Sequence, residues 1–303
     1  MNRTASVSRP SALHAWLLAA RPKTLSVSFA PVLVGTTLAW QETAMVLWLP
    51  AIMALVAALL IQIGTNLHND AADFLRGADA PGRLGPARAV ASGWLSARQA
   101  EMAAIACFAL ALTCGVYLAW HGGWPIVALG LAALASGWAY TGGPRPLAYT
   151  GLGEVFVYLF FGLGAVMGSF YLQTFRLDWS VLVAASMLGM LAAAVIVVNN
   201  YRDLDQDRAI GKNTLAVRLG RERSQVEYGL LLFLPYLLLP VLYVLTGMSK
   251  WGAALPYLSL LWAMRLLYRF ATEPAGPGFN HILAQTAQLQ LLFGVLLSIG
   301  ILL

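Results

Sequence analysis

The stretch Val198–Gly220 reads VNNYRDLDQDRAIGKNTLAVRLG and follows directly on an apolar run. Only 11% of the residues in this chain are charged, yet the stretch places three aspartates within five residues: Asp203, Asp205 and Asp207. A second stretch, Asn66–Asp79 (NLHNDAADFLRGAD), ends another apolar run in the same way. Together the two stretches hold six of the thirteen acidic residues. The sequence is therefore organised around two acidic clusters, each at the end of an apolar segment.

The composition indicates a membrane protein. The chain has 303 residues, 59% of them hydrophobic, and a mean hydropathy of +0.71. Soluble globular proteins average roughly 45–50% apolar residues. Apolar runs of about 18 residues or more, the length of a transmembrane helix, recur from end to end. A bilayer forces spanning segments to satisfy their backbone hydrogen bonds internally, and these runs lack the alternation of barrel strands, so we predict an all-α polytopic protein.

We predict about nine transmembrane helices in a single domain, because no linker or composition shift divides the chain. Residues 1–20 are expected to form an N-terminal cytoplasmic segment. The predicted spans are 22–40, 46–67, 101–120, 124–140, 152–172, 180–199, 226–246, 252–270 and 282–303. The fourth is short, and eight spans would move the last segments to the other side of the membrane.

The Lys and Arg side chains sort to one side of this topology. Seventeen of the nineteen fall at the N-terminus or in, or beside, the second, fourth, sixth and eighth connections, the eighth being flanked by Arg265 and Arg269. Only Arg176 and Lys250 fall on the other side. Because cytoplasmic connections carry an excess of Lys and Arg, both acidic clusters are predicted to face the cytoplasm.

The acidic clusters have the composition of a metal site. Residues four apart share one face of a helix, where like charges repel, and carboxylates beside hydrocarbon are costly. Hard divalent cations relieve both costs, and Mg²⁺ commonly shares such a site with substrate phosphates. The alternative is a solvated helix end that basic residues neutralise. The predicted metal ligands are Asn66, Asn69, Asp70, Asp73, Asn199, Asp203 and Asp207.

Basic and aromatic side chains near the clusters are candidates for binding a substrate. Arg and Lys can bind phosphate oxygens that metal ions leave free, although each could instead anchor the chain at the membrane surface. The tyrosines of the Gly/Pro-rich connection Tyr140–Glu154 could orient an aromatic substrate or belong to an interfacial belt. The substrate-binding candidates are Arg21, Lys23, Arg83, Arg88, Arg208, Lys212 and Tyr149. The catalytic candidates are Asp73, Asp203, Asp207 and Tyr140.

A short internal repeat links the clusters. Asn69, Asp73 and Gly77 are spaced four apart, and the same spacing runs through Asn199–Gly211. Two similar helix ends from two halves of a bundle could enclose one site between them.

Taken together, these stretches resemble the UbiA-type intramembrane prenyltransferases, and more narrowly their 1,4-dihydroxy-2-naphthoate polyprenyltransferase branch. The narrower match is supported by AWLLAARPKTLSVSFAPVLVGTTLAW (15–40), GADAPGRLGPARAVASG (77–93) and YTGGPRPLAYTGLGE (140–154). The resemblance spans residue 15 to about residue 220. It assigns Asn69, Asp70 and Asp73 to the first metal motif, and Asp203 and Asp207 to the second. The sequence departs from the family pattern at Ala71, where an aromatic residue often stands, and at Gly77, where the wider superfamily tends to have a third aspartate.

The resemblance implies nine helices around a central cavity that opens sideways to lipid beneath cytoplasmic loops. It implies two Mg²⁺ ions that bridge the carboxylates and the diphosphate of a polyprenyl diphosphate. The implied reaction transfers the polyprenyl chain to 1,4-dihydroxy-2-naphthoate, releases diphosphate and carbon dioxide, and gives demethylmenaquinol. The implied location is the bacterial cytoplasmic (inner) membrane. No nucleic-acid partner is expected, and no oligomeric state is predicted.

Other functions remain open at this point. An enzyme of the same class could use another acceptor, such as 4-hydroxybenzoate. An ion- or proton-coupled transporter also uses intramembrane carboxylates, but these acids lie at helix ends on one side and not at mid-membrane. A non-catalytic scaffold does not account for two charge-dense clusters. The soluble prenyl-diphosphate synthases also use aspartate-rich motifs, and the hydropathy excludes them.

Overall fold

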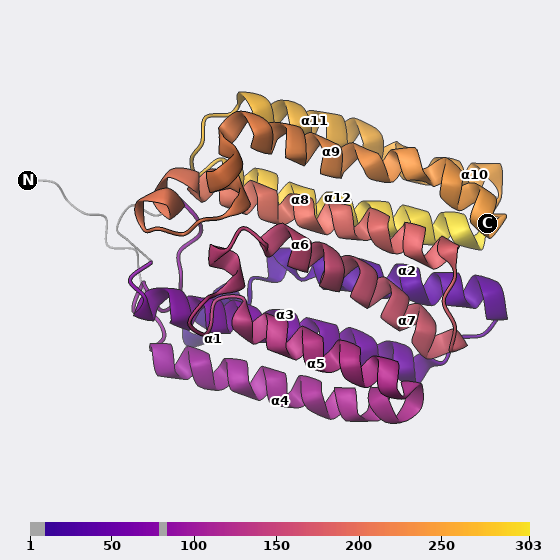
Figure 1. The fold of residues 1–303 in the computed structure, drawn as a ribbon, viewed down its shortest axis with the longest axis horizontal. Coiled ribbons are helices and arrows are strands. Elements are labelled where there is room, and N and C mark those ends of the chain that lie inside the picture. Colours follow the sequence, from indigo (N-terminus) through magenta and orange to yellow (C-terminus); the bar gives the residue numbers. More distant parts are fainter. Residues whose placement is uncertain (1–9, 79–83) are drawn as a thin grey trace, which may run out of the picture.

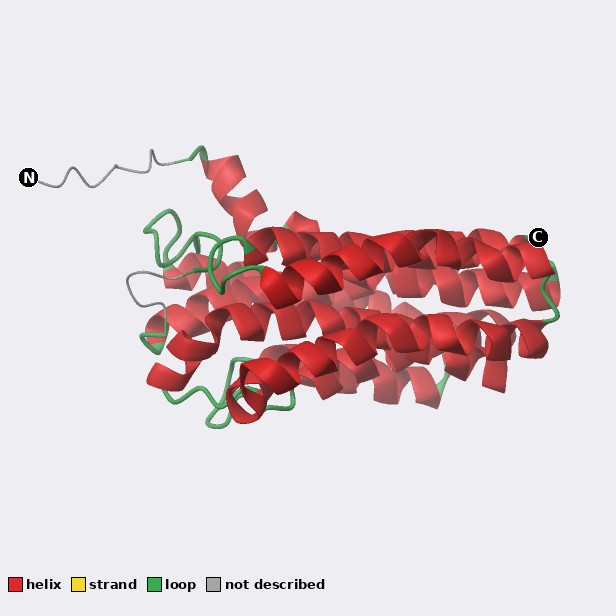
Figure 2. Cartoon of the chain, turned by 90° about the horizontal axis from the view of Figure 1, so that it is seen from above, coloured by secondary structure: helices red, strands yellow, loops and turns green. Residues whose placement is uncertain are grey.

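The protein is a bundle of long helices that lie side by side along its longest axis (Figures 1 and 2). The computed structural model describes residues 10–78 and 84–303, and within these ranges there is no β-strand. The first half contains α1 (Ala12–Ala20), η1 (Pro22–Thr24), α2 (Ser26–Thr43), α3 (Trp48–Leu75), α4 (Ala97–Gly122), α5 (Trp124–Ala139) and η2 (Leu147–Tyr149). It is followed by α6 (Gly153–Val157), the π-helical η3 (Tyr158–Gly164), α7 (Ala165–Thr174), α8 (Trp179–Ala209), α9 (Leu215–Thr246), α10 (Lys250–Ala254), η4 (Leu255–Ser259), α11 (Leu260–Thr272) and α12 (Phe279–Leu302).

The all-α prediction is confirmed, and helix occurs at every predicted span. Among the described residues, six helices are long and apolar enough to cross a membrane, and α1 with α2 makes a seventh if the pair, bent by 48°, is one span. Helix α5 has only 16 residues. The predicted span 252–270 is divided into α10, η4 and α11, with Pro256 at the start of η4. The count of nine spans therefore stays a prediction.

Helix α8 lies at the centre of the bundle. In its most apolar stretch 72% of the residues are buried inside the protein, against 17% in α4. The backbones of α8 and η3 approach closely at Gly189 and Gly162, where a Cβ on Gly162 would overlap the Cα of Gly189. Helix α5 is the opposite case, because it buries only Ile126. The tightly packed α8 is therefore the rigid support of the second acidic cluster.

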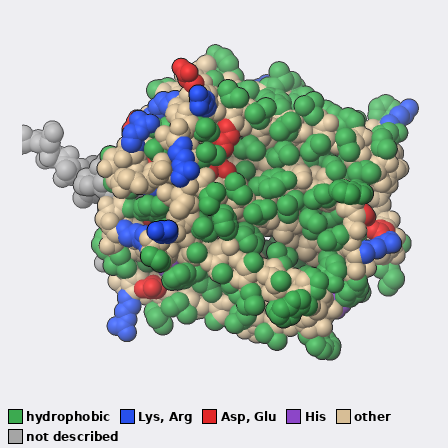
Figure 3. Space-filling model, in the orientation of Figure 1, with side chains coloured by type: hydrophobic (Ala, Val, Ile, Leu, Met, Phe, Trp, Pro, Cys, Tyr) green, Lys and Arg blue, Asp and Glu red, His purple; other side chains and the backbone are tan. Residues whose placement is uncertain are grey.

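The two ends of the bundle differ in their side chains. On the face shown in Figure 3, charged side chains gather at the ends, most of them at the end where the chain begins, and a hydrophobic band lies between. The ends of α3 and α8 that carry the acidic clusters lie at that same N-terminal end (Figure 1). Six exposed tryptophans stand where helices begin or end at the opposite end: Trp40, Trp48, Trp120, Trp124, Trp179 and Trp251. Tryptophan is enriched at membrane–water interfaces, so this ring marks one boundary of the hydrocarbon.

Candidate active site

Helices α3 and α8 end in the same way. Gly77 and Gly211 adopt the left-handed conformation, with φ of 70° and 73°. The main-chain N–H of the next residue donates to the carbonyl of Asp73 (2.9 Å) in one helix and of Asp207 (2.8 Å) in the other. Glycine adopts this conformation without the steric cost that a Cβ adds. Asp73 and Asp207 therefore occupy equivalent places, four residues before a capping glycine, which supports the predicted repeat and aligns these two acids.

The first cluster is held together by the loop that follows it. Asp70 is 2% exposed, and its Oδ2 accepts hydrogen bonds from the main-chain N–H groups of Ala89 (3.0 Å) and Val90 (3.3 Å). The Arg88 guanidinium donates to Asp73 Oδ2 (2.7 Å) and to the carbonyl of Asn69 (2.9 Å). Asp70 thus fixes the loop, and the loop brings Arg88 to Asp73.

The amides predicted as metal ligands have protein partners. Asn69 Oδ1 accepts a hydrogen bond from the buried hydroxyl of Thr141, in the Gly/Pro-rich connection after α5. Asn66 Nδ2 donates to the carbonyl of Ala20 at the end of α1 (3.0 Å). These bonds fasten α3 to two neighbouring segments, a role that the sequence pattern did not indicate.

The second cluster is built on a buried arginine. The Arg202 side chain is 1% exposed and donates to both carboxylate oxygens of Asp203, from Nε to Oδ1 (2.8 Å) and from Nη2 to Oδ2 (2.6 Å). It also donates to Asn199 Oδ1 (2.9 Å) and, from Nη1, to Asn280 Oδ1 on α12 (2.7 Å). Asp203 therefore faces a guanidinium whose own position other side chains determine.

Asp207 and Asp205 lie in contrasting environments. Asp207 is buried, its Oδ1 lies 3.5 Å from Lys212 Nζ, and its Oδ2 has no hydrogen-bond partner among the described residues. The Asp205 side chain is 73% exposed and pairs with Arg221 (2.7 Å). Arg208 is exposed as well. The face of α8 that carries Asp203 and Asp207 is thus the inner one.

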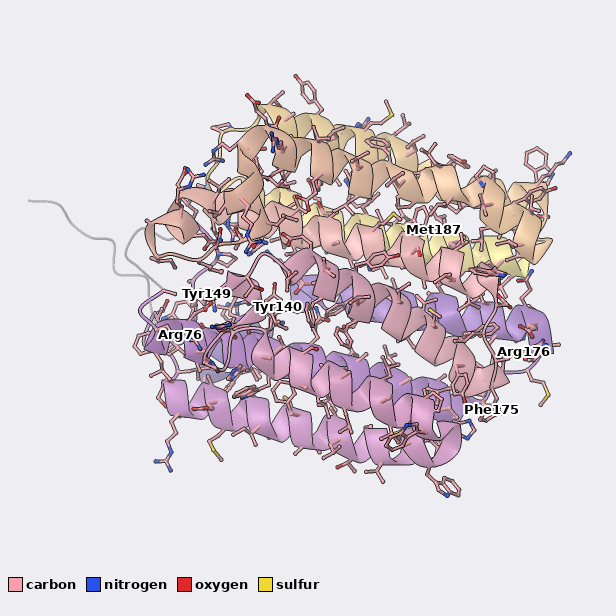
Figure 4. The ribbon with its side chains drawn as sticks, in the orientation of Figure 1. Arg76, Tyr140, Tyr149, Phe175, Arg176 and Met187 are labelled. Atoms are coloured by element: carbon pink, nitrogen blue, oxygen red, sulfur yellow. The ribbon has the colours of Figure 1, made fainter. Side chains whose placement is uncertain are left out.

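Two predicted tyrosines lie at the same end of the bundle as the clusters (Figure 4). Tyr149 OH donates a long hydrogen bond to Asp73 Oδ1 (3.4 Å), and Arg76 and Lys212 lie over its ring, 5.8 and 5.6 Å from the centroid. Burial, reinforced by the charge of Asp73, raises the pKa of Tyr149 to about 12. The phenol is therefore a neutral hydrogen-bond donor. Tyr140 lines the cavity described next.

A cavity of about 640 Å³ extends from the acidic clusters into the bundle. Its polar end is lined by Asn66, Asn69, Asp70, Asp73, Tyr140, Asn199, Arg21, Lys23, Arg88, Arg202 and Lys212. The rest of the wall is mostly apolar and comes from α1 to α8 and α12. Along α3 the lining runs from Asp73 to Ala54, which is 19 residues and hence about 28 Å. That length is close to the roughly 30 Å of a bilayer's hydrocarbon core.

The cavity includes most of the predicted site. Asp203, Asp207 and Tyr149 are not on its wall, but each contacts a residue that is. Asp203 pairs with Arg202, Asp207 pairs with Lys212, and Tyr149 donates a hydrogen bond to Asp73. Arg208 is not on the wall, and among the described residues no hydrogen bond joins it to a residue of the wall. Arg83 lies outside the described residues, as does Asp79. Arg202 and Asn280, which the sequence analysis did not select, both line the cavity.

The residues suit a divalent cation that they share with substrate phosphates and water, and not one that protein side chains enclose. Within the described ranges no three His, Cys, Asp or Glu side chains converge on one point as a closed metal site. Mg²⁺, however, is usually held by one or two carboxylates together with substrate phosphates and water. Each carboxylate oxygen has two lone pairs, so a bond to arginine leaves room for a cation. The unpartnered Asp207 Oδ2 supplies an open ligand position.

Comparison with known proteins decides the family. The sequence model of the UbiA prenyltransferase family matches residues 28–276. The chain belongs to this family. A UbiA protein of this kind is an integral-membrane prenyltransferase, and the long apolar helices agree with that.

Relatives in bacteria cover nearly the whole chain. A protein of Mycobacterium leprae named 1,4-dihydroxy-2-naphthoate octaprenyltransferase is 38% identical over 89% of this chain and 90% of its own length. One of the same name in Escherichia coli is 37% identical over 96% of both. The structure of a UbiA homologue from Archaeoglobus fulgidus, bound to GPP and Mg²⁺, superposes with a TM-score of 0.69 at 18% identity, over 95% of this chain and all of the other. The UbiA fold is thereby confirmed.

Proposed function

We propose that this chain transfers a polyprenyl group from polyprenyl diphosphate to 1,4-dihydroxy-2-naphthoate, with release of diphosphate and carbon dioxide, to give demethylmenaquinol. The names of the bacterial relatives support this acceptor. The observation that carries the proposal is the shape of the cavity. One end holds five Lys and Arg side chains beside Asp70 and Asp73, and the remainder is an apolar passage about as long as the hydrocarbon core is thick.

This cavity matches an amphiphilic donor. The polyprenyl tail is apolar and gains free energy by leaving water for the passage between the helices. The diphosphate is a polyanion, and Arg88 and Lys212 at the polar end can donate charge-assisted hydrogen bonds to it. Arg21 and Lys23, at the start of η1 and within it, also line the cavity and are proposed to bind the remaining anionic groups, among them the acceptor carboxylate. For Arg83 and Arg208, substrate binding stays a prediction.

Magnesium is proposed to be held between the clusters, with Asp73, Asp203 and Asp207 as its principal carboxylates. Two ions are proposed, with Asn66, Asn69, Asp70 and Asn199 as the further oxygen donors. Bound Mg²⁺ would neutralise the diphosphate as it leaves. Arg88 and Arg202 hold the Asp73 and Asp203 carboxylates in fixed orientations, which is how residues behind metal ligands commonly act.

The cavity wall protects the reacting carbon from water. Departure of the diphosphate leaves an allylic cation, and Phe156, Phe160 and Phe161 line the passage. Aromatic faces stabilise a nearby cation, and the exclusion of water prevents its hydrolysis. An electron-rich carbon of the naphthoate ring then attacks the cation. Tyr140, on the wall at the polar end, is proposed to orient this ring.

The test uses protein purified into lipid nanodiscs, with Mg²⁺, a labelled polyprenyl diphosphate and two acceptors offered separately. We expect alkylation of 1,4-dihydroxy-2-naphthoate, loss of turnover in EDTA, and recovery when Mg²⁺ or Mn²⁺ is added back. Alkylation of 4-hydroxybenzoate alone would assign the other acceptor. Full turnover under rigorous chelation would rule out the metal-held diphosphate, and ion flux without any transfer would indicate a transporter.

We also propose that the protein lies in the bacterial cytoplasmic membrane with both acidic clusters facing the cytoplasm. The exposed residues Arg98 and Lys250 stand near opposite ends of the bundle. In a chain with Cys107 and Cys114 replaced by alanine, an impermeant thiol reagent applied to intact spheroplasts should label Lys250→Cys and not Arg98→Cys. The reverse pattern would invert the proposed orientation.

A further inference from the structure

We propose that Asn280, in the first turn of α12, is a positioning residue that couples the two acidic clusters. The proposal rests on the proposed function, because it concerns the same metal and diphosphate site. Asn280 lies beyond residue 276, where the match to the family model ends. It is 77 residues from Asp203 in sequence, and the sequence around it (FNHILAQ) contains no acidic residue.

Both the oxygen and the nitrogen of the Asn280 side-chain amide form hydrogen bonds. Its Oδ1 accepts a hydrogen bond from Arg202 Nη1 (2.7 Å), and its Nδ2 donates to the carbonyl of Leu84 (3.0 Å). An asparagine amide has one accepting oxygen and one donating nitrogen, so this side chain can bond to both partners at once. It therefore ties α8 to the loop that follows the first cluster.

The hydrogen bond between Asn280 and Arg202 determines how the Asp203 carboxylate is oriented. Arg202 is 2% exposed and makes a bidentate pair with Asp203. A planar guanidinium carries its donors in a rigid fork, so fixing Nη1 also fixes the two nitrogens that face the carboxylate. Removing the Asn280 oxygen would leave a buried donor without this acceptor, and the guanidinium would turn toward another one. The Asp203 carboxylate would turn with it.

The hydrogen bond between Asn280 and the Leu84 carbonyl fixes the loop that follows the first cluster. Leu84 stands four residues before Arg88, which donates to Asp73 Oδ2 (2.7 Å) and to the Asn69 carbonyl (2.9 Å). Hydrogen bonds through Arg202 and Asn280, followed by the backbone of residues 84–88, thus connect Asp203 with Asp73. A diphosphate that both clusters bind requires a fixed separation between their carboxylates, and Asn280 is a side chain that spans this gap by hydrogen bonds at both ends.

The same helix supplies a matched control. Gln285 Oε1 accepts a hydrogen bond from Arg269 Nη1 (2.8 Å), so it too is a side-chain amide on α12 that holds an arginine. Neither Gln285 nor Arg269 lines the cavity. Gln285→Ala removes an arginine–amide bond on the same helix without touching the site, and so reports the structural cost of such a bond at a more exposed arginine.

The experiment compares Asn280→Ala, Asn280→Asp and Gln285→Ala with the wild type. Asn280→Asp keeps an acceptor for Arg202 but cannot donate to Leu84. Because this variant still provides a partner for the buried guanidinium, we expect it to fold even if Asn280→Ala does not. Two readouts are taken for each folded variant: kcat at saturating Mg²⁺, and the affinity for Mn²⁺ measured by electron paramagnetic resonance in the presence of polyprenyl diphosphate without acceptor.

We expect Asn280→Ala to weaken Mn²⁺ binding and lower kcat by about 10–100-fold, the usual cost of losing a group that orients metal ligands. Asn280→Asp should fall between this value and the wild type, and Gln285→Ala should match the wild type in both readouts. Mn²⁺ affinities that agree across all four proteins would overturn the inference. A wild type that binds Mn²⁺ and diphosphate but alkylates no naphthoate would contradict the proposed function alone, since the Mn²⁺ readout needs no acceptor.

Discussion

At the scale of single residues, the sharpest contrast is between acids on the two faces of α8. Asp203 and Asp207 face inward, whereas Asp205 is exposed and paired with Arg221. Replacing Asp73, Asp203 or Asp207 by asparagine should each reduce turnover by orders of magnitude, because each removes a carboxylate proposed to hold the Mg²⁺ that would neutralise the departing diphosphate, an effect worth several kcal/mol. Asp205→Asn should stay near the wild type. The measurement is turnover of the four folded variants at saturating Mg²⁺. An Asp205→Asn loss as deep as that of Asp203→Asn would refute this division.

Tyr149 makes a prediction about pH. Because burial and Asp73 raise its pKa to about 12, the phenol keeps its proton throughout the pH range in which transfer can be assayed. Tyr149→Phe should therefore leave the alkaline limb of the pH–rate profile where it is. The lost hydrogen bond to Asp73 should lower kcat only about fivefold, which corresponds to about 1 kcal/mol for one neutral donor. A displaced alkaline limb would mean that Tyr149 itself titrates during the reaction.

The limits of sequence reasoning are visible in Arg202. The two clusters of acids could be predicted, because carboxylates beside apolar runs are rare and need a partner. For Arg202 the pattern offered only the alternative to a metal site, in which basic residues neutralise the helix end. Neighbouring residues in a helix do not face each other, so a pair between Arg202 and Asp203 was not foreseen. The long side chain folds back to make that pair, and its other partner, Asn280, comes from a distant helix that no local pattern identifies.

At the scale of secondary-structure elements, the contact between η3 and α8 depends on two glycines. A Cβ on Gly162 would overlap the backbone of Gly189, whereas a Cβ on Gly130 of α5 would meet nothing within 4 Å. Gly162→Ala must push the two helices apart, and overpacking of this kind costs about 1–3 kcal/mol. Its melting temperature in one detergent should fall clearly below that of Gly130→Ala. Equal melting temperatures would show that this contact does not hold the bundle together.

The elements themselves were predictable to different degrees. Long apolar runs identify α3, α4, α8, α9 and α12, because the bilayer leaves little choice but helix. The π-helical η3 and the break at η4 were not predicted. The first packs against α8 through the contact of Gly162 with Gly189, which hydropathy does not report, and the second has Pro256 at its start.

At the scale of the whole molecule, the chain is polarised along the long axis of the helix bundle. Basic side chains and both acidic clusters occupy one end, and the ring of exposed tryptophans occupies the other. The distribution of Lys and Arg predicted this polarity. It did not predict the cavity, which depends on side chains from helices α1 to α8 and α12 and on glycines such as Gly115 and Gly130 that leave open space in its wall. The central cavity was expected only through the family resemblance.

The shallow burial of α5 has a consequence for the membrane around the protein. This helix forms one wall of the cavity and buries only Ile126, so its exposed surface is divided between the cavity and the lipid. We expect the lateral pressure of the surrounding acyl chains to act on the lipid-facing side of this wall. Tightly ordered saturated chains should press it closed and slow the entry of the donor, and loosely packed unsaturated chains should let it part. The bilayer would then act as a mechanical regulator, setting KM for polyprenyl diphosphate through its own packing while kcat stays constant.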